Sequence, residues 1–255
     1  MNRIELASIE DAGLNASATA LERLLDGWLL RFSPGKAKRA RCINALAPGR
    51  IELARKVALC EQAYAEAGLP MIVRVTPFSA QDGLDADLAQ IGLRRFDDTR
   101  VMVLPELQPP AAAAVPRGLA LRALTGDALA HAVGALRGSS AAQCEAHAER
   151  LRQSCIAWSG LVLQGAEGRT LACGQVAVEG GLAGLYDVFT APEARGRGLA
   201  RALCIELLRI AHCAGARRAY LQVEGDNHPA RALYHGLGFA DAYAYHYRTR
   251  DPRAA

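Results

Sequence analysis

The stretch that decides the fold runs from residue 185 to residue 200 and reads Leu-Tyr-Asp-Val-Phe-Thr-Ala-Pro-Glu-Ala-Arg-Gly-Arg-Gly-Leu-Ala. Its first half favours a strand that ends at Pro192. A turn rich in Gly and Arg follows and opens into an amphipathic helix predicted over 199–214. Glycines let backbone N–H groups point outward, and a helix N-terminus adds unpaired donors. With Arg195 and Arg197 beside it, the turn suits an anion such as a diphosphate.

Two other phosphate-binding patterns are absent from this turn. A dinucleotide fingerprint needs G-x-G-x-x-G within a βαβ unit, and a mononucleotide loop needs G-x-x-x-x-G-K-[ST]. The turn by itself is also compatible with an ordinary basic turn in front of a helix. A second observation is therefore needed before a function is assigned.

The second informative segment, 221–239, reads Leu-Gln-Val-Glu-Gly-Asp-Asn-His-Pro-Ala-Arg-Ala-Leu-Tyr-His-Gly-Leu-Gly-Phe. Asn227 is a predicted helix N-cap, because Pro229 follows in the first turn, where its missing donor costs little. Asn227, Ala230, Arg231 and Tyr234 then share one helix face, which we expect to look towards a cleft.

Together the two segments resemble the GNAT (Gcn5-related N-acetyltransferase) superfamily. Arg195-x-x-Gly198-x-Ala200 is similar to the R/Q-x-x-G-x-G/A motif that holds the pyrophosphate of acetyl-CoA in that family. Residues 227–239 match the pattern N-x-x-A-x-x-L-Y-x-x-L-G-F at every position. The resemblance covers residues 118–250 and implies an N-acetyltransferase in which a primary amine directly attacks acetyl-CoA, the co-substrate. The alternative is a non-catalytic acyl-CoA-binding or sensor module.

The resemblance also implies the site residues. Those expected to bind acetyl-CoA are Val188, Phe189, Thr190, Arg195, Gly196, Arg197, Gly198, Leu199, Ala200, Asn227, Ala230 and Tyr234. A backbone N–H at Val188 is suited to polarising the acetyl carbonyl. Tyr234 is expected near the sulfur as general acid, since a phenol has a pKa near 10; a Tyr that only packs is the other interpretation.

The attacking amine must be neutral, which requires a base or a water chain. Asp187 and Glu224 sit near the ends of their strands and are the two candidates for the catalytic base. Either carboxylate is equally able to cap a turn or hold a substrate ammonium. His228 is a weaker candidate, and the remaining five histidines, including His147, receive no role.

The element order predicted for the C-terminal half is βααβββαβαβ, an α/β (α+β) fold in which helices flank a mixed sheet. The N-terminal half repeats part of this order at an offset of about 147 residues: Gly49, Gly68 and Gly92 follow the same spacing as Gly196, Gly215 and Gly238 to within one residue. We expect a degenerate GNAT-like domain at 1–105, a Pro-rich linker at 106–117 and an acetyltransferase domain at 118–255. The first half lacks the Arg-Gly turn and should not bind CoA; we expect it to be structural or to shape the acceptor cleft.

Composition and charge restrict the partners. The chain has 255 residues, a net charge of +4 and 51% hydrophobic residues, which describes a globular protein. No run is long enough to span a bilayer and the N-terminus has no apolar stretch, so a cytoplasmic protein without membrane contact is expected. The acceptor, a small molecule or a protein, stays open, as does the choice between a homodimer and a monomer with pseudo-dimeric halves.

Two groups of residues, the cysteines and a basic run, are not assigned a functional role. The seven scattered cysteines form no paired spacing, so we expect no metal site or disulfide, and a buried free thiol at each. The basic run from Lys36 to Arg41 is predicted to be a solvated turn between two strands, and no nucleic-acid partner is expected.

Overall fold

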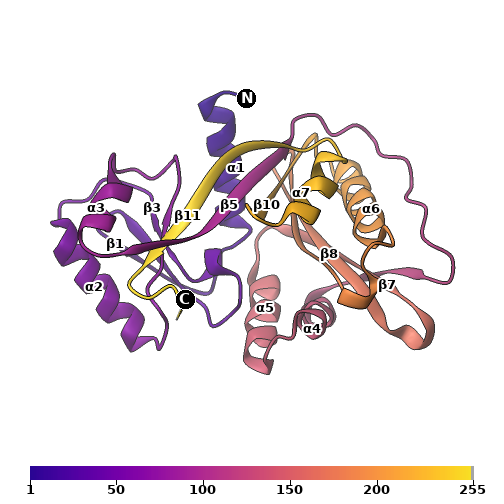
Figure 1. The fold of residues 1–255 in the computed structure, drawn as a ribbon, viewed down its shortest axis with the longest axis horizontal. Helices are drawn as coiled ribbons and strands as arrows, with labels where there is room; N and C mark the ends of the chain where they lie inside the picture. Colours follow the sequence, from indigo (N-terminus) through magenta and orange to yellow (C-terminus); the bar gives the residue numbers. More distant parts are fainter. Residues whose placement is uncertain (254–255) are drawn as a thin grey trace.

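One sheet runs through the whole chain. The computed structural model describes residues 1–253, in which eleven strands follow the order β1-β2-β3-β4-β11-β5-β10-β9-β8-β7-β6. The strands are β1 Leu21–Leu25, β2 Trp28–Phe32, β3 Ile43–Ala45, β4 Val73–Val75, β5 Arg94–Leu104, β6 Ala120–Leu124, β7 Ala157–Gln164, β8 Thr170–Glu179, β9 Leu182–Thr190, β10 Arg218–Glu224 and β11 Ala240–Thr249. The helices are α1 Arg3–Asn15, α2 Leu53–Glu66, α3 Leu84–Gln90, α4 Gly126–Arg137, α5 Ala141–Gln153, α6 Leu199–Cys213 and α7 His228–His235 (Figure 1).

The predicted fold class is confirmed. The sheet is mixed, because β3 pairs with β4 and β9 with β10 in parallel, while the other neighbours are antiparallel. The C-terminal half follows the predicted order of strands and helices. Two N-terminal elements, α1 and β1, have no counterpart in the sequence prediction.

The two halves exchange their last strands. In the N-terminal half, β2-β3-β4 continues with β11, and in the C-terminal half, β8-β9-β10 continues with β5. Both series follow the sequence antiparallel, parallel, antiparallel. Strands β5 and β11 pair with each other in the middle of the molecule (Figure 1). This pseudo-symmetric topology supports the duplication inferred from the glycine spacing.

The segment between β5 and β6 has no helix or strand over 106–116 and runs along α6. The Leu107 N–H donates to the Arg217 carbonyl at 2.7 Å, and the Ala113 N–H donates to the Glu206 carboxylate at 2.7 Å. The proposed boundaries at 105 and 118 thus separate the halves along the chain. In the folded structure, however, the exchanged strands β5 and β11 pair with each other and join the two halves.

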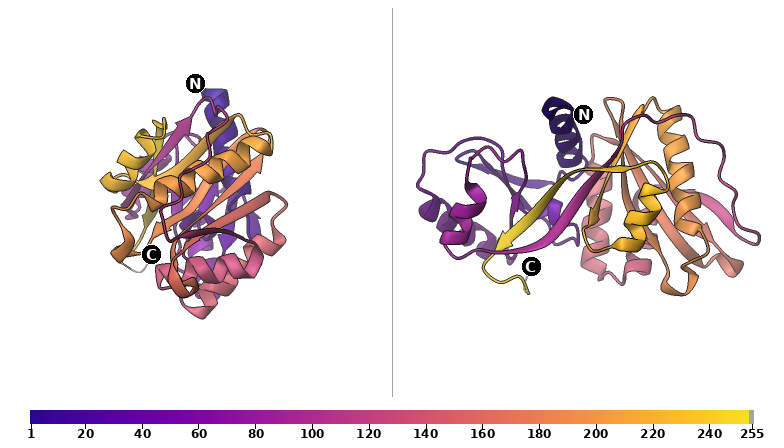
Figure 2. Two further views of the ribbon diagram at one scale, coloured as in Figure 1. Left: turned by 90° about the vertical axis from the view of Figure 1, so that its right-hand side faces the viewer. Right: turned by 45° about the horizontal axis from the view of Figure 1, so that its top comes forward.

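Helices α4 and α6 cover opposite faces of the C-terminal part of the sheet (Figure 2). Side chains alternate along the strands, so Leu161 and Ala172 pack in the cluster under α6, whereas Val162 and Cys173 pack in the cluster under α4. On α6 itself, Leu203 and Leu207 are fully buried. Burial of each such leucine contributes about 1.5–3 kcal/mol, which fixes the helix, and hence its N-terminal turn, on the sheet.

Helix α1 lies over the region where the two halves meet (Figure 1). Asn2 and Glu5 form a capping box at its start. Ile9 and Ala12 pack in one cluster with tyrosines of several strands, among them Tyr220 and Tyr245. The Glu10 carboxylate forms a buried ion pair with Arg74 of β4. The helix therefore joins elements from both halves.

Two sequence predictions are wrong. The run from Lys36 to Arg41 is not a solvated turn: Lys36 donates to the carbonyls of Arg137 and Gly138, and Lys38 pairs with Asp97 at 2.7 Å. This run packs against the end of α4 and against β5, because these elements offer it carbonyl and carboxylate acceptors. Nor are all seven thiols buried, since Cys155 and Cys213 are exposed.

Within residues 1–253, no helix combines the length and the apolar content that crossing a membrane requires.

Candidate active site

Strand β9 carries a bulge at Asp187 and Val188. In its ladder with β8, the flanking pairs are Gln175 with Tyr186 and Cys173 with Phe189. Two residues of β9 therefore stand opposite Gly174 alone. Asp187 has a φ of 48°, a left-handed conformation that Asp adopts more readily than most residues. Bulges of this kind re-aim side chains and interrupt the ladder.

The bulge changes which face each side chain of β9 occupies. Leu185 and Val188 pack in the cluster under α6. Tyr186 packs in the cluster that includes α1, and the Asp187 carboxylate pairs with Arg137 of α4. Two successive side chains thus point to the face opposite α6, and Val188 returns to the α6 face.

Strands β9 and β10 separate next to this bulge. Their parallel pairing ends at Leu185 and Leu221, although β9 continues to Thr190 and β10 to Glu224. The two strands therefore leave a wedge open between their carboxyl ends, and Asp187 and Val188 lie on its β9 edge. Crevices at the carboxyl ends of parallel strands are common ligand sites.

The Gly-Arg turn lies at the start of α6. Gly196 and Gly198 both have a φ of 74°, and Gly198 is the N-cap residue of the helix, without a capping side chain. In the described chain, none of the backbone N–H groups from Gly196 to Arg201 donates a hydrogen bond. Arg195 and Arg197 are exposed. Free amides, a helix N-terminus and two guanidinium groups form an anion-binding turn.

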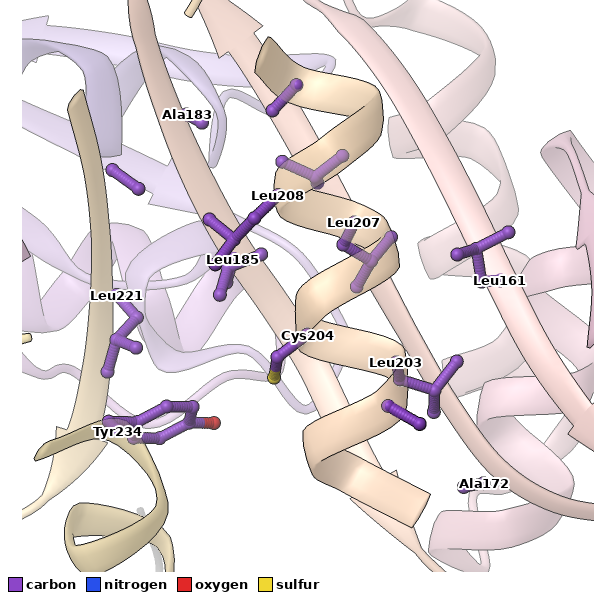
Figure 3. Packing of buried hydrophobic residues seen from close by; sticks show 14 of the residues in the cluster. Leu161, Ala172, Ala183, Leu185, Leu203, Cys204, Leu207, Leu208, Leu221 and Tyr234 are labelled. Atoms are coloured by element: carbon purple, nitrogen blue, oxygen red, sulfur yellow. The ribbon is translucent and has the colours of Figure 1, made fainter. Parts of the chain in front are cut away.

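Tyr234 of α7 lies across from the first turns of α6. Its side chain is buried, its ring packs edge-on against Phe239, and its hydroxyl points towards α6 near Cys204 (Figure 3). The hydroxyl forms no hydrogen bond within residues 1–253. Burial raises the pKa of Tyr234, and the neighbouring Cys204 adds to the shift. The phenol is therefore protonated throughout the physiological range.

The N-terminal turn of α7 is built largely as predicted. The Asn227 side chain accepts from the Ala230 N–H at 3.2 Å, which confirms its N-cap role. Ala230 packs with Tyr234 in the α6-side cluster. Arg231 departs from the expected common face: it donates to the Gly225 carbonyl and pairs with Asp241, because these acceptors lie beside it.

Asp187 belongs to a polar cluster on the face opposite α6. Its carboxylate accepts from Arg137 and Gln175, and His147 lies 3.7 Å away. Burial acts to raise the pKa of Asp187, but His147 when protonated, the Arg137 and Arg150 guanidinium groups and the Gln175 hydrogen bond outweigh it and lower the pKa. Burial lowers the pKa of His147 to about 4, so this imidazole is neutral at pH 7.

Glu224 lies apart from this cluster. It is exposed at the end of β10 and pairs in register with Thr99 of β5. In the described chain its carboxylate makes no side-chain hydrogen bond or ion pair. The two candidate bases thus lie on different strands on either side of the wedge. Asp187 is held by hydrogen-bond and ion-pair partners, whereas Glu224 has none in the described chain.

A family model identifies this region. Residues 136–239 match the model of the Acetyltransferase (GNAT) family. Residues 136–239 form a GNAT domain. The match begins at the end of α4 and includes the bulge, the Gly-Arg turn and Tyr234.

Curated relatives match part of the chain. An uncharacterized N-acetyltransferase, YobR, of Bacillus subtilis (strain 168) is 37% identical over 79 residues, 31% of this chain and 32% of that protein. A mycothiol acetyltransferase of Clavibacter michiganensis subsp. michiganensis is 38% identical over 82 residues, 32% of this chain and 27% of that protein. The chain thus spans less than a third of the length of the curated relatives it matches.

Solved structures extend the likeness to the whole fold. A GCN5-related N-acetyltransferase from Kribbella flavida has a TM-score of 0.68 at 16% identity and covers 97% of this chain and 95% of its own. A tandem GNAT protein from the clavulanic acid biosynthesis pathway has a TM-score of 0.58 at 24% identity and covers 80% of this chain and 73% of its own. At these identities the likeness concerns the fold.

Sequence reasoning missed part of the site around the GNAT domain. A cavity that is partly open to solvent lies between α4, α5 and residues 33–40, and Asp187, His147 and Arg150 line it. His147 and Arg150 come from α5, forty residues before the bulge. The sequence offered one signal only, that the two residues lie three positions apart and share a helix face.

Proposed function

We propose that the GNAT domain transfers an acetyl group from acetyl-CoA to a primary amine. The observation that carries this proposal is the row of free backbone N–H groups from Gly196 to Arg201 beside the open wedge. A diphosphate fits such a row, since it replaces the missing acceptors and lies at the positive end of the α6 dipole. Arg195 and Arg197 would add charge-assisted hydrogen bonds, while Leu199 and Ala200 hold the first helical turn in place.

The wedge is suited to an extended ligand chain. Thr190 Oγ1 at its β9 edge is buried and has no hydrogen-bond partner among the described residues. A ligand lying along Val188, Phe189 and Thr190 would supply one, and Asn227 and Ala230 would border it from α7. Buried polar atoms without a partner are costly, which is why this hydroxyl supports a bound chain here.

Acetyl-CoA, when bound, supplies the acetyl group as a thioester. We assign to Val188 the backbone N–H that polarises the carbonyl, because the bulge frees part of the ladder there. The amine nitrogen bonds to the acetyl carbon as the carbon–sulfur bond breaks. Tyr234 acts as general acid at the departing sulfur, and the surplus proton of the amine restores the phenol.

A different proton, the one that the incoming ammonium must lose before its nitrogen can attack, is accepted by Asp187 or Glu224. Asp187 faces the cavity and is well placed to hold an ammonium, but its lowered pKa makes it a weak base. Glu224 forms no ion pair in the described chain, but it is exposed at the end of β10. The pH dependence of kcat/KM in Asp187→Asn and Glu224→Gln would separate these roles, because only loss of the base removes the acidic limb of the profile.

The N-terminal half is, in this proposal, a degenerate copy that binds no CoA. Its counterpart of the anion-binding turn, before α2, is already filled by Asp26. The Asp26 carboxylate accepts from the N–H groups of Arg50 and Ile51 at 2.9 Å and pairs with Lys56 at 2.8 Å. These contacts lower the pKa of Asp26, the Lys56 hydrogen bond most strongly. A protein carboxylate thus takes the place that a phosphate would need.

The proposal is tested by free-thiol release from acetyl-CoA across a panel of primary amines. We expect release that depends on the amine and is lost in Gly198→Glu, where a carboxylate enters the anion-binding turn. Gly215→Glu is the matched control, because Gly215 also has a positive φ with open space around it, at the far end of α6. Acetyl-CoA binding without release for any amine would refute transfer and leave an acyl-CoA-binding module.

A further inference from the structure

The cavity between α4, α5 and residues 33–40 has an excess of positive charge. Its lining includes Lys36, Arg137 and Arg150, against a single carboxylate, that of Asp187. His147 adds no charge at pH 7, since burial holds its pKa near 4. The cavity therefore favours an anionic group.

Two of these three cations already have partners. Arg137 pairs with Asp187. The Lys36 ammonium donates to the Arg137 carbonyl at 2.7 Å and to the Gly138 carbonyl at 3.0 Å, at the negative end of the α4 dipole. The Arg137–Asp187 pair joins α4 to β9, and the Lys36 hydrogen bonds join the N-terminal half to the end of α4.

Arg150 is different. Its guanidinium forms no ion pair or hydrogen bond with any residue of the described chain, although the side chain is half-buried. Burial lowers the pKa of Arg150, Asp187 acts in the opposite direction, and the positive charges of Arg39 and Arg137 add to the lowering. A partly buried cation without an ion-pair partner is stabilised when an anion binds beside it.

The positions of the polar groups define the shape of a ligand. His147 and Arg150 lie one turn apart on α5, about 4.5 Å along the helix axis. Asp187, at the bulge and 3.7 Å from His147, lines the same cavity. An amine at Asp187 and a carboxylate at Arg150 are thus within the span of one small molecule.

We propose that this cavity binds the acceptor and that the acceptor is a small amine carrying a carboxylate, which Arg150 recognises. The assignment rests on the proposed acetyl transfer, because that reaction brings an amine to the bulge. Arg150 is the specificity-determining residue in this scheme, since a guanidinium binds a carboxylate through two parallel hydrogen bonds. Polycationic acceptors, such as aminoglycoside-like amines or lysine-rich protein segments, are disfavoured by the same charge.

The first test compares amino acids with their primary amides as acceptors. Each pair presents the same amine with and without a carboxylate. We expect the wild-type protein to acetylate acids with a kcat/KM at least ten-fold above that of the matching amides, and Arg150→Gln to remove this preference by raising the KM of the acids. Arg150→Lys should restore part of it, because the charge remains and the planar fork is lost.

Arg152→Gln is the matched control. Arg152 lies on the same helix but faces solvent, where it pairs with Asp127 and Glu145. Its removal should leave the preference for acids intact. Arg150→Gln should melt no lower than wild type, because it breaks no hydrogen bond or ion pair within the described chain, and a melting curve therefore separates lost recognition from lost folding.

A binding measurement makes the test independent of catalysis. N-acetylated amino acids and their amides, which mimic the product, are titrated calorimetrically into wild type and Arg150→Gln. If wild type binds the N-acetyl acids and Arg150→Gln binds them at least ten-fold more weakly, the anion site stands even where thiol release is absent and acetyl transfer has failed. If wild type does not distinguish acids from amides in either assay, the proposal is overturned.

Discussion

The sharpest single substitution is Tyr234→Phe, which removes one hydroxyl and keeps the ring. The ring accounts for the packing against Phe239 and α6, and the hydroxyl has no hydrogen-bond partner within residues 1–253. We therefore expect the free energy of unfolding to change by less than about 1 kcal/mol, since no hydrogen bond is lost. If Tyr234 acts as general acid, kcat should fall about 10²–10⁴-fold, the usual contribution of such catalysis.

The assay measures thiol release at saturating acetyl-CoA and amine, alongside urea unfolding and calorimetric binding of acetyl-CoA. The dissociation constant of acetyl-CoA should stay within about three-fold of wild type, because the anion-binding turn is untouched. Tyr64→Phe provides the contrast: its hydroxyl donates to the Arg31 carbonyl at 2.9 Å in the N-terminal core. That variant should lose about 1–3 kcal/mol of stability and no kcat. A Tyr234→Phe enzyme with kcat within three-fold of wild type would refute the role of the phenol.

Three further predictions concern the scaffold. A fragment of residues 118–255 should not unfold cooperatively by circular dichroism, because it lacks β5, the partner of both β10 and β11; a cooperative transition would contradict the strand exchange. Glu10→Leu should cost about 3–5 kcal/mol in urea unfolding, because Arg74 is left buried without its carboxylate, and Glu10→Leu with Arg74→Leu should recover most of it; equal losses in both would count against the ion pair. Asp85 has its pKa lowered to about 2, chiefly by its hydrogen bond with Arg248, despite opposing desolvation. Because the folded pKa lies below the unfolded value, its contribution is present above pH 4 and is lost as pH falls towards 2, so the stability difference between wild type and Asp85→Asn should shrink over that range.

The local elements of the C-terminal half were predictable because their signals are local. The strand before Pro192, the Gly-Arg turn and the cap at Asn227 each depend on residues within one turn or strand. The helix predicted over 199–214 is observed as α6, Leu199–Cys213. Propensity, capping and periodicity agree in these segments, so a single sequence is sufficient there.

Helix α1 and the strand exchange were not predictable in the same way. The buried face of α1 is short and consists largely of small residues such as Ala12 and Ala16, so its apolar periodicity is weak. Its position depends on contacts with strands more than 150 residues away. The exchange of β5 and β11 also cannot be predicted from the residues of these strands, because nothing in a strand's own sequence specifies which half provides its partner.

The residues of the candidate site also fall into two groups, those that local motifs predict and those that only packing brings together. The turn at 195–200 and Tyr234 follow from motifs, whereas His147, Arg150 and Lys36 reach the cavity only through packing of α4 and α5 on the sheet. The sequence predicts a solvated run from Lys36 because it does not show the acceptors of that run, two of which are carbonyls at the end of α4. Isolated charges become informative only once their neighbours are known.

The most direct test of the account is a calorimetric titration of acetyl-CoA into wild type, Gly198→Glu and Gly215→Glu. The account predicts micromolar binding with one molecule per chain, because Asp26 fills the corresponding turn of the N-terminal half. Binding should be lost in Gly198→Glu and kept in Gly215→Glu. Absence of binding to folded wild type, or equal binding to all three proteins, would contradict the anion-binding turn and with it the proposed acetyl transfer.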